Sequence, residues 1–419
     1  MPVKYSIIVP CYNGCDYIQH CINSIIQQSY DDYEVIVSDD HSDDGTKQYL
    51  QFISSDPKIR FVETCERLSM TEHWEWALSH AKGEWLIFVG QDDALQSYFF
   101  ELADKLTKIA TAEGIRAIAS ERAYFFWGGC ESTYGDVAVS YRAHPTTKIH
   151  TSAVEAAKAL FGISDYFELP QMYTTSLFHR SLLDEAKRKQ AGVVFSCHPQ
   201  DANLAAIACT LEKKYLKSNI PLGWVGSSPK SAGLAVFAAD DKKQGTSANE
   251  LTKLKIDYED KINKSKFKYN SLAGDFALAD LPVYFWQSLL ETSPLRSDRV
   301  NNLLTSRAFR YIFFSFLLFR VISSGAASRK RSILFNIYRA NNLKPIIFSI
   351  AVFSSIVFFL FYKLISFPFR VVRKVLRIIF KSHHLAFFVS RTARPDILPE
   401  DASRQANGIF DRYLRDSIL

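Results

Sequence analysis

The chain has 419 residues, of which 47% are hydrophobic and 22% charged, so it is long enough for two or three domains with a sizeable core and is not disordered by composition. The net charge of +6 is unevenly spread, because residues 299–395 carry 17 basic and no acidic side chains while residues 1–298 carry 30 basic and 39 acidic ones. This asymmetry indicates a polyanionic partner for the basic part, either nucleic acid or anionic lipid.

Short β-branched runs alternate with helical patterns over the first hundred residues, as repeated βα units do. The spacing predicts strands at residues 5–9, 34–37, 59–62 and 85–89. It predicts helices at residues 18–26, 45–53 and 70–81. Because the carboxyl ends of parallel strands meet at one edge of a sheet, where ligands bind, we expect the polar segments that follow these strands to form one site.

The pattern loosens after residue 112. It predicts a strand-like segment at 115–127, helices at 152–161 and 202–217, a flexible loop at 223–233 and a linker or surface helix at 238–266. No internal repeat or low-complexity tract is present.

The cysteines and the N-terminus indicate a cytosolic protein. The seven cysteines are an odd number, and they form neither a disulfide framework nor a Cys-x-x-Cys zinc spacing. The apolar run at residues 5–9, which ends at Pro10, is too short for a signal peptide. We therefore expect the N-terminal region to remain in a reducing cytosol.

The segment "SDDHSDDGT", residues 38–46, follows the second predicted strand. Capping of the next helix by Asp43 or Asp44 explains one of its four aspartates. A calcium loop is rejected because its twelfth position is not Glu. We therefore predict that Asp39 and Asp40 bind a ligand, since an aspartate at this edge can accept a hydrogen bond from the imide N–H of a pyrimidine.

Two adjacent carboxylates, Asp92 and Asp93, follow the fourth predicted strand in "LIFVGQDDAL". One alternative is that Asp92 caps a helix that begins near Ser97. The other is a divalent cation held by one or both carboxylates together with ligand phosphates, and such a cation relieves their mutual repulsion. At the same edge "VPCYNG" is a weak turn signal, in which Tyr12 offers a ring for a base to stack on.

Together, "SIIVPCYNG", "YEVIVSDDHSDDGT" and "AKGEWLIFVGQDDAL" resemble the N-terminal half of the family 2 glycosyltransferases, which are inverting enzymes with the GT-A fold. The resemblance covers residues 3–110 closely and 111–235 loosely. It implies a nucleotide-diphosphate sugar donor and Mg²⁺ or Mn²⁺. The donor-binding residues that we predict are Pro10, Tyr12, Asn13, Asp39, Asp40, Gln91 and Asp92, with Asp92 and Asp93 as metal ligands.

The chain departs from this family in three places. Gly90 stands where the first acid of the family's Asp-x-Asp motif is expected, and "TEHW" at residues 71–74 replaces the common Ala-Arg-Asn. The family's catalytic base is an acid at a helix start, usually in Glu-Asp, and "HPQDANLAAIAC" places Gln200 and Asp201 there. Asp201 is the predicted base, with simple capping of its helix as the alternative and His198 as a rival base.

The predicted chemistry follows from these roles. Asp201 takes a proton from an acceptor hydroxyl, the oxygen attacks the anomeric carbon, and the nucleotide diphosphate leaves. A general base contributes about 10²- to 10⁴-fold in rate. Lys230 and Ser231 are weaker candidates for a loop that closes over the diphosphate or the acceptor.

The basic C-terminal part predicts membrane association. Residues 345–362 carry no charge and reach about 27 Å as a helix, which is borderline for one span. One or two crossings would place clusters of basic residues outside, against the positive-inside rule. Residues 370–381, "RVVRKVLRIIFK", have basic and aliphatic faces typical of an interfacial helix. We expect these helices to lie in the cytosolic leaflet and to contact anionic lipid, and we do not expect the chain to bind nucleic acid. The alternative is that the helix at 370–381 packs on the catalytic domain.

The predicted architecture is an α/β, GT-A mixed sheet flanked by helices, followed by a basic, apolar, helical membrane-associating region. Residues 1–235 form the catalytic domain, with a nucleotide-sugar half (1–110) and an acceptor half (111–235); a linker (236–300), membrane-associating helices (301–395) and a tail (396–419) follow. The predicted function is the transfer of one sugar to a saccharide acceptor, lipid-linked, in cell-surface polysaccharide synthesis. No Arg-Trp pair of a processive synthase is present. The alternative is a catalytically inactive, membrane-associated adaptor.

Overall fold

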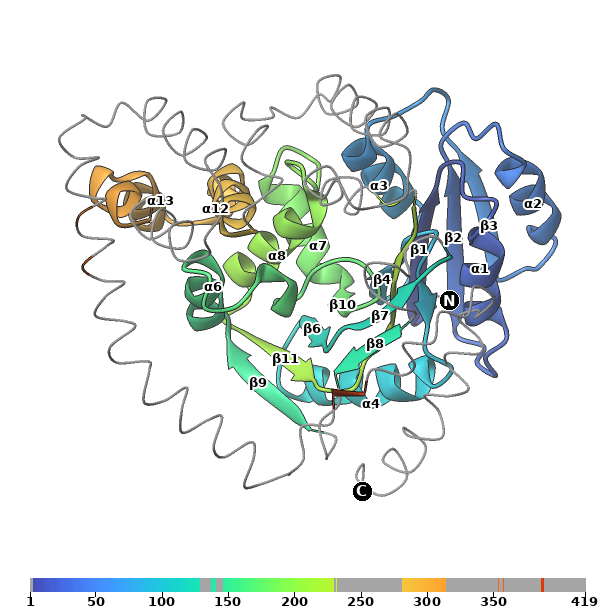
Figure 1. Cartoon of the computed structure of the whole chain (residues 1–419), viewed down its shortest axis with the longest axis horizontal. Coiled ribbons are helices and arrows are strands. Elements are labelled where there is room, and N and C mark those ends of the chain that lie inside the picture. Colours follow the sequence, from blue (N-terminus) through green and yellow to red (C-terminus); the bar gives the residue numbers. More distant parts are fainter. Residues whose placement is uncertain are drawn as a thin grey trace.

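The computed structural model describes residues 3–128, 137–140, 146–229, 231 and 281–313, together with residues 353, 357, 386 and 387. Its main feature is an eight-stranded mixed sheet with the strand order β3-β2-β1-β4-β10-β6-β11-β9. Figure 1 shows this sheet from β3, on the right of the view, to β9 at the lower left. The predicted α/β mixed sheet flanked by helices is confirmed.

The parallel half of the sheet brings three strand ends together. β1 (Tyr5–Cys11) lies between β2 (Tyr33–Asp39) and β4 (Trp85–Phe88), and β3 (Ile59–Glu63) pairs with β2. All these pairs are parallel, and Cys11 lies opposite Asp39 in the ladder. The four predicted strands are confirmed, each to within two residues at either end.

Antiparallel pairing joins this half to the rest of the sheet. β10 (Ser176–His179) runs antiparallel to both β4 and β6 (Ala117–Ser120), whereas β11 (Lys214–Ser218) is parallel to β6 and antiparallel to β9 (Thr147–Thr151). A second sheet has the order β13-β8-β7-β12-β5. Its strands are β5 (Ala94–Leu95), β7 (Ala123–Phe126), β8 (Val137–Ser140), β12 (Gly223–Ser227) and β13 (Ala386–Phe387).

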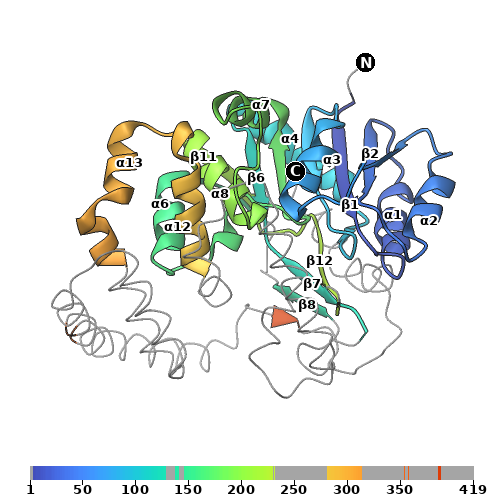
Figure 2. The same cartoon turned by 90° about the horizontal axis from the view of Figure 1, so that it is seen from above.

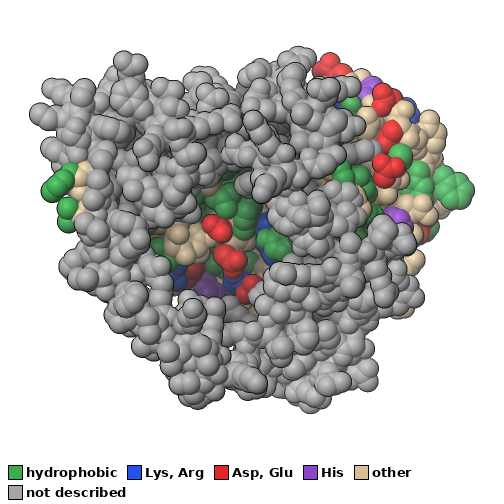
Figure 3. Space-filling model, in the orientation of Figure 1, with side chains coloured by type: hydrophobic (Ala, Val, Ile, Leu, Met, Phe, Trp, Pro, Cys, Tyr) green, Lys and Arg blue, Asp and Glu red, His purple; other side chains and the backbone are tan. Residues whose placement is uncertain are grey.

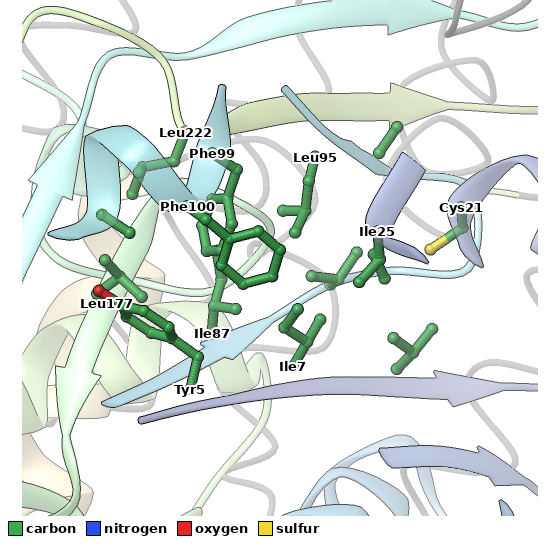
Figure 4. Close-up of a cluster of buried hydrophobic side chains, with 14 of the residues drawn as sticks. Tyr5, Ile7, Cys21, Ile25, Ile87, Leu95, Phe99, Phe100, Leu177 and Leu222 are labelled. Carbon is green, nitrogen blue, oxygen red and sulfur yellow. The ribbon is translucent and has the colours of Figure 1, made fainter. Parts of the chain in front are cut away.

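Side chains that alternate along the parallel strands build one core on each face of the main sheet. Ile7, Val9 and Ile87 face a core shared with α1 (Ile18–Ile26), α2 (Thr46–Ile53) and α4 (Phe99–Ala112), part of which is drawn in Figure 4. Ile8 and Phe88 face the other core. Its helices are α3 (Met70–Ser79), α6 (Ser152–Leu160), α7 (Arg180–Lys189), α8 (Gln200–Leu211) and α12 (Leu281–Glu291).

Three sequence predictions are corrected beyond residue 112. The strand-like segment 115–127 is two strands, β6 and β7, which belong to different sheets. The helix predicted at 202–217 ends at Leu211, because residues 214–218 pair with β6 and β9 instead. The loop predicted at 223–233 begins with strand β12, which lies between β7 and β5. In each case pairing between distant strands overrides the local pattern.

The end of the predicted linker packs on the core that contains α8. Phe285 and Trp286 of α12 are buried in the same core as α8, and Leu304 of α13 (Asp298–Thr305) and Phe313 join them. Figure 2 shows α6, α8, α12 and α13 grouped on one side of the molecule. The basic segments 345–362 and 370–381 lie outside the described residues, apart from residues 353 and 357. Within the described part of the chain, no helix has the length and apolar character needed to cross a bilayer.

Candidate active site

The loops after β1, β2 and β4 are joined by bonds between side chains and backbone. Gln91 accepts a hydrogen bond from the Tyr12 N–H at 2.8 Å and donates one to the Tyr12 carbonyl at 3.1 Å. The Asn13 N–H donates to the Ser42 hydroxyl, and the Asn13 side-chain oxygen accepts from the Asp43 N–H. The predicted meeting of these strand ends is confirmed. The side chains of Asn13 and Gln91, which are predicted to contact the donor, form hydrogen bonds with the backbone of neighbouring loops.

Asp39 has the properties of a ligand-binding carboxylate. Its side chain is fully buried at the end of β2, where Oδ2 accepts a hydrogen bond from the Ser42 N–H at 3.1 Å. Its Oδ1 is buried without a hydrogen-bond partner among the described residues. Burial raises the pKa of Asp39. A buried acceptor that lacks a donor costs free energy, and a ligand N–H removes that cost. The predicted pairing with an imide N–H fits this oxygen.

Asp40 has its partners inside the protein. Its Oδ1 accepts hydrogen bonds from the Thr64 hydroxyl and the Leu68 N–H, at 3.0 and 2.9 Å. Its Oδ2 pairs with Arg67 at 2.9 Å, and the guanidinium of Arg67 lies over the ring of Tyr12. Asp40 therefore holds the loop after β3 against the Tyr12 loop. Asp44, in turn, accepts from the N–H of Thr46 at the start of α2, as the capping alternative expects.

Asp92 and Asp93 are held in different ways. The hydroxyls of Ser228 and Ser231 both donate to Asp92 Oδ2, at 2.9 and 2.5 Å. Asp93 accepts two backbone hydrogen bonds, from the N–H of Gly90 and from that of Gly226, each at 2.7 Å. The helix that Asp92 was expected to cap in the alternative reading begins instead at Phe99, with Tyr98 as its N-cap. That alternative is wrong.

The two glycines that donate to Asp93 are required by close approach. A Cβ on Gly226 would lie 1.7 Å from the carbonyl oxygen of Asp92. A Cβ on Gly90 would lie 2.9 Å from Asp93 Oδ2 and 3.3 Å from Asp92 Oδ1. Glycine at position 90, the departure from the Asp-x-Asp pattern, therefore makes room for both carboxylates.

The buried carboxylate pair suits one divalent cation. Burial raises the pKa of Asp92, and burial together with the charge of Asp92 raises the pKa of Asp93 to about 8. The described residues contain no group of three or more His, Cys, Asp and Glu side chains that could hold a metal ion. Mg²⁺ commonly needs only one or two carboxylates when substrate phosphates complete its ligands. Asp92 fits this role better than Asp93, because loop hydroxyls hold Asp92 whereas fixed backbone N–H groups hold Asp93.

Asp201 lies in the first turn of α8. Its Oδ2 accepts a hydrogen bond from the Tyr166 hydroxyl at 3.0 Å, and its Oδ1 accepts one from the Ala202 N–H at 2.8 Å. Burial raises the pKa of Asp201, while these hydrogen bonds and the charge of Arg122 oppose the increase. The N-cap of α8 is Pro199, and it makes no side-chain capping bond. Asp201 is therefore a buried carboxylate with raised basicity, in the place where a general base is predicted.

Two further residues connect the carboxylates of β4 with Asp201. Burial and the charge of Asp201, followed by those of Asp93 and Asp92, raise the pKa of the Tyr173 hydroxyl. The guanidinium charge of Arg122 lowers the pKa of both Asp93 and Asp201. Hydrogen bonds also connect Tyr173 and its neighbour to both sides: Gln200 Nε2, next to Asp201, donates to the Tyr173 hydroxyl, and the Thr174 N–H donates to the Phe88 carbonyl at the end of β4. In Figure 3 acidic and basic side chains are visible together in the middle of the molecule.

The remaining predicted residues surround this region. Pro10 lies opposite Ser38 in the ladder, where β1 ends. Burial lowers the pKa of His198 to about 4, so His198 is a weaker base than an exposed histidine. Ser231 bonds to Asp92, as described, whereas Lys230 lies outside the described residues.

The "TEHW" segment has a structural explanation. His73 shares a hydrogen bond of 2.9 Å with the Ser38 hydroxyl, and burial lowers the pKa of His73 to about 4. The Trp74 ring packs edge-on against Phe88 and Tyr173. The segment therefore docks α3 on β2 and supports Tyr173.

Four residues of this site are not predicted from the sequence: Arg122, Tyr166, Tyr173 and Ser228. Arg122 lies inside a segment that reads as one strand, and the two tyrosines precede β10 without a motif. Their positions depend on contacts between segments far apart in the chain. Only the polar loop after β12, with its serines, could have indicated Ser228.

Comparisons with known proteins agree with the motifs. Residues 6–128 match the family model described as "Glycosyl transferase family 2". The putative teichuronic acid biosynthesis glycosyltransferase TuaG of Bacillus subtilis is 36% identical over 89 residues, which are 21% of this chain and 35% of TuaG. A Campylobacter jejuni GalNAc(5)-diNAcBac-PP-undecaprenol beta-1,3-glucosyltransferase is 35% identical over 96 residues, 22% of this chain and 31% of that enzyme.

The matched region is thus about a third of the length of these relatives. Among solved structures, S. aureus TarS 1–349 in complex with UDP-GlcNAc is similar with a TM-score of 0.44 and 14% identity, over 80% of this chain and 92% of that one. The family model covers all three strand-end loops of the site. Residues 6–128 of the chain are therefore similar to glycosyltransferase family 2.

Proposed function

We propose that the chain is an inverting glycosyltransferase of GT-A architecture that moves one sugar from a nucleotide-sugar donor to a hydroxyl of a saccharide acceptor. The observation that carries this proposal is that Tyr173 and Thr174 connect the end of β4, which Asp92 and Asp93 follow, with the first turn of α8, which contains Asp201. It gives one place for a diphosphate and a base on the far side of the sugar. The names of two relatives, which refer to teichuronic acid and to an undecaprenol-linked glycan, support a lipid-linked acceptor in cell-surface polysaccharide synthesis.

The donor is held at the parallel strand ends in this proposal. Asp39 accepts the imide N–H of the base through Oδ1, which has no partner among the residues that the structure describes, and the Tyr12 ring lies under Arg67. Asp92 would hold Mg²⁺ or Mn²⁺ together with the phosphate oxygens of the donor. When bound, such an ion neutralises charge on the leaving diphosphate.

Asp201 acts on the acceptor. Its carboxylate takes the proton of the acceptor hydroxyl while that oxygen forms a bond to the anomeric carbon. The bond from the anomeric carbon to the diphosphate oxygen breaks on the opposite face, and the nucleotide diphosphate leaves with the electron pair. The raised pKa of Asp201 suits this role, because a carboxylate with a higher pKa is a stronger base.

We also propose that the protein works at the cytosolic face of a membrane. The support is compositional: residues 299–395 carry 17 basic and no acidic side chains among long apolar runs. Each basic residue near anionic lipid contributes about 1 kcal/mol. Helices that lie in the leaflet keep these charges on the same side as a cytosolic donor.

The proposed function is tested with a panel of nucleotide sugars and Mg²⁺ or Mn²⁺, by measuring nucleotide diphosphate release. Wild-type protein is expected to release the diphosphate from at least one donor, and Asp92→Ala to lose that release. Failure of wild-type protein with every donor would favour the inactive adaptor instead. Gly90 and Gln200, which stand at positions where the family has acids, are the features that make this second function worth testing.

A further inference from the structure

Arg122 is a cation whose charge acts on Asp201 and that has no ion-pair partner among the described residues. Its guanidinium lies 4.1 Å from the centre of the Phe167 ring, and that ring is 4.5 Å from the ring of Tyr166, whose hydroxyl bonds to Asp201. Within the described part of the chain Arg122 makes no hydrogen bond or ion pair, and its Nε is buried without an acceptor. A guanidinium fixed on a ring and left unpaired offers its N–H groups to an anion.

Tyr173 is a second donor on the same side. Its hydroxyl oxygen accepts a hydrogen bond from Gln200 Nε2 at 2.9 Å, so its own hydrogen is available for another acceptor. Gln200 precedes Asp201 in the first turn of α8, and its side chain lies near His198. Its Oε1 accepts no hydrogen bond from any of the described residues. The Tyr173 hydroxyl stays protonated, since burial and the nearby carboxylates raise its pKa.

The backbone holds Tyr173 in an unusual conformation. Tyr173 and Thr174 both have left-handed φ angles, +66° and +58°, which non-glycine residues rarely adopt. The Thr174 N–H donates to the carbonyl of Phe88 at 2.9 Å, and the Tyr173 ring packs edge-on against Trp74. Strained residues that the surrounding structure fixes in this way are concentrated at binding sites.

We propose that Arg122 and Tyr173 form a subsite for an oxyanion of the acceptor, a phosphate or carboxylate close to the hydroxyl that Asp201 deprotonates. Both are donors, so the group that they bind must supply acceptor oxygens and a negative charge. Both lie near Asp201, the proposed base that acts on the acceptor. Arg122 packs on Phe167, which contacts Tyr166, and Tyr173 is hydrogen-bonded to Gln200, the neighbour of Asp201. This inference rests on the proposed function and narrows it to acidic acceptors.

Binding is tested without a donor, on the full-length protein, with sn-glycerol 3-phosphate, glycerate and glycerol as probes. Saturation-transfer NMR is used to measure their dissociation constants. Wild-type protein is expected to bind at least one of the two anions more tightly than glycerol, and the two anions distinguish a phosphate site from a carboxylate site. Arg122→Gln should weaken that anion about tenfold or more, because a charge-assisted hydrogen bond is lost. Tyr173→Phe keeps the ring against Trp74 and should weaken it roughly two- to tenfold.

Arg188→Gln is the matched control, because Arg188 is exposed on α7 and the change in net charge is the same. Equal anion affinity in Arg122→Gln and Arg188→Gln would overturn the subsite. So would a result in which Arg122→Gln weakens UDP but not the anion probes, because Arg122 would then bind the donor diphosphate. Thermal unfolding of each variant shows whether a loss of binding reflects misfolding; if Arg122→Gln does not fold, Arg122→Lys takes its place and is expected to show a partial loss.

The nucleotide-release assay separates this inference from the proposed function. If wild-type protein releases nucleotide diphosphate while the anion probes bind no better than glycerol, the oxyanion subsite fails alone. If no donor yields release, the proposed function fails, and the assignment of the oxyanion to an acceptor fails with it.

Discussion

Two neighbouring aspartates at the end of β2 have opposite surroundings. Asp39 has a buried oxygen with no hydrogen-bond partner in the described part of the chain, whereas Asp40 is bonded to Thr64, Leu68 and Arg67. Adjacent residues of the same type therefore serve different purposes: one is available to a ligand and the other holds a loop. Mutation of each residue separates the two roles.

Asp39→Ala is expected to weaken UDP binding about tenfold, because a ligand bond to a charged group is lost. It should lower the free energy of unfolding less than Asp40→Ala does, because among the described residues only Ser42 donates a hydrogen bond to the Asp39 side chain. Asp40→Ala should instead lower the free energy of unfolding by about 2–4 kcal/mol, since it removes the ion pair with Arg67 and the acceptor of the Leu68 N–H. Calorimetric titration with UDP and denaturant unfolding measure the two effects. The reverse pattern, with binding lost only in Asp40→Ala, would show that Asp40 is the donor contact.

Tyr166 tunes the predicted base. Its hydroxyl donates to Asp201, and this bond lowers the pKa of that carboxylate. Tyr166→Phe removes the donor, so the pKa of Asp201 should rise further. Because the ionised form is the base, the acid limb of the pH profile of kcat/KM is expected to move to higher pH. Tyr49→Phe, on α2, should keep the wild-type profile; an unchanged or downward-shifted limb in Tyr166→Phe would exclude this role.

At the scale of elements, β12 fixes the position of the Asp92 loop. Gly226 of this strand donates to Asp93 and passes so close to the Asp92 carbonyl that no side chain fits. The second sheet is therefore a wall of the site, and Ser228, just beyond β12, reaches Asp92 from it.

Gly226→Ala should separate β12 from the Asp92 loop, because its Cβ would overlap the carbonyl oxygen of Asp92. We expect a destabilisation of more than about 1–3 kcal/mol, the usual effect of overpacking, together with loss of nucleotide release. Thermal unfolding and the release assay measure both. Ser227→Ala, the adjacent change on β12, is the control. Wild-type stability and turnover in Gly226→Ala would contradict the close contact.

The sequence is sufficient to predict the elements and site residues that depend on local pattern. The strands of the first hundred residues carry a clear βα rhythm, so β1 to β4 and the meeting of their ends were predictable. The split of residues 115–127 into β6 and β7 was not, because the strands enter different sheets only through pairing with β11 and β12. Asp92 and Asp201 could be predicted because each lies in a local sequence motif. Arg122 and Tyr173 could not be predicted, because their places in the site depend on contacts between distant segments.

At the scale of the whole molecule, the C-terminal part begins inside the catalytic core. Trp286 and Phe313 lie in contact, with ring centroids 5.2 Å apart, and both belong to the core that contains α8. A truncation that tests membrane association should therefore end after Phe313, so that this core is kept.

Removal of residues 314–419 is expected to abolish salt-sensitive sedimentation with vesicles that contain anionic lipid, because 14 basic residues of the segment 299–395 are lost. Sedimentation at low and high salt, with neutral vesicles as the control, measures the effect. Nucleotide release from the truncated protein shows that the catalytic core is still folded. Undiminished binding of the truncated protein to anionic vesicles would place the membrane contact elsewhere.

The most direct test of one site shared by Asp92 and Asp201 compares Asp201→Asn with wild-type protein in two assays. We predict that Asp201→Asn binds UDP with wild-type affinity in the presence of Mn²⁺ but transfers sugar about 10²- to 10⁴-fold more slowly, as expected for loss of a general base. Transfer at the wild-type rate by Asp201→Asn would contradict the account.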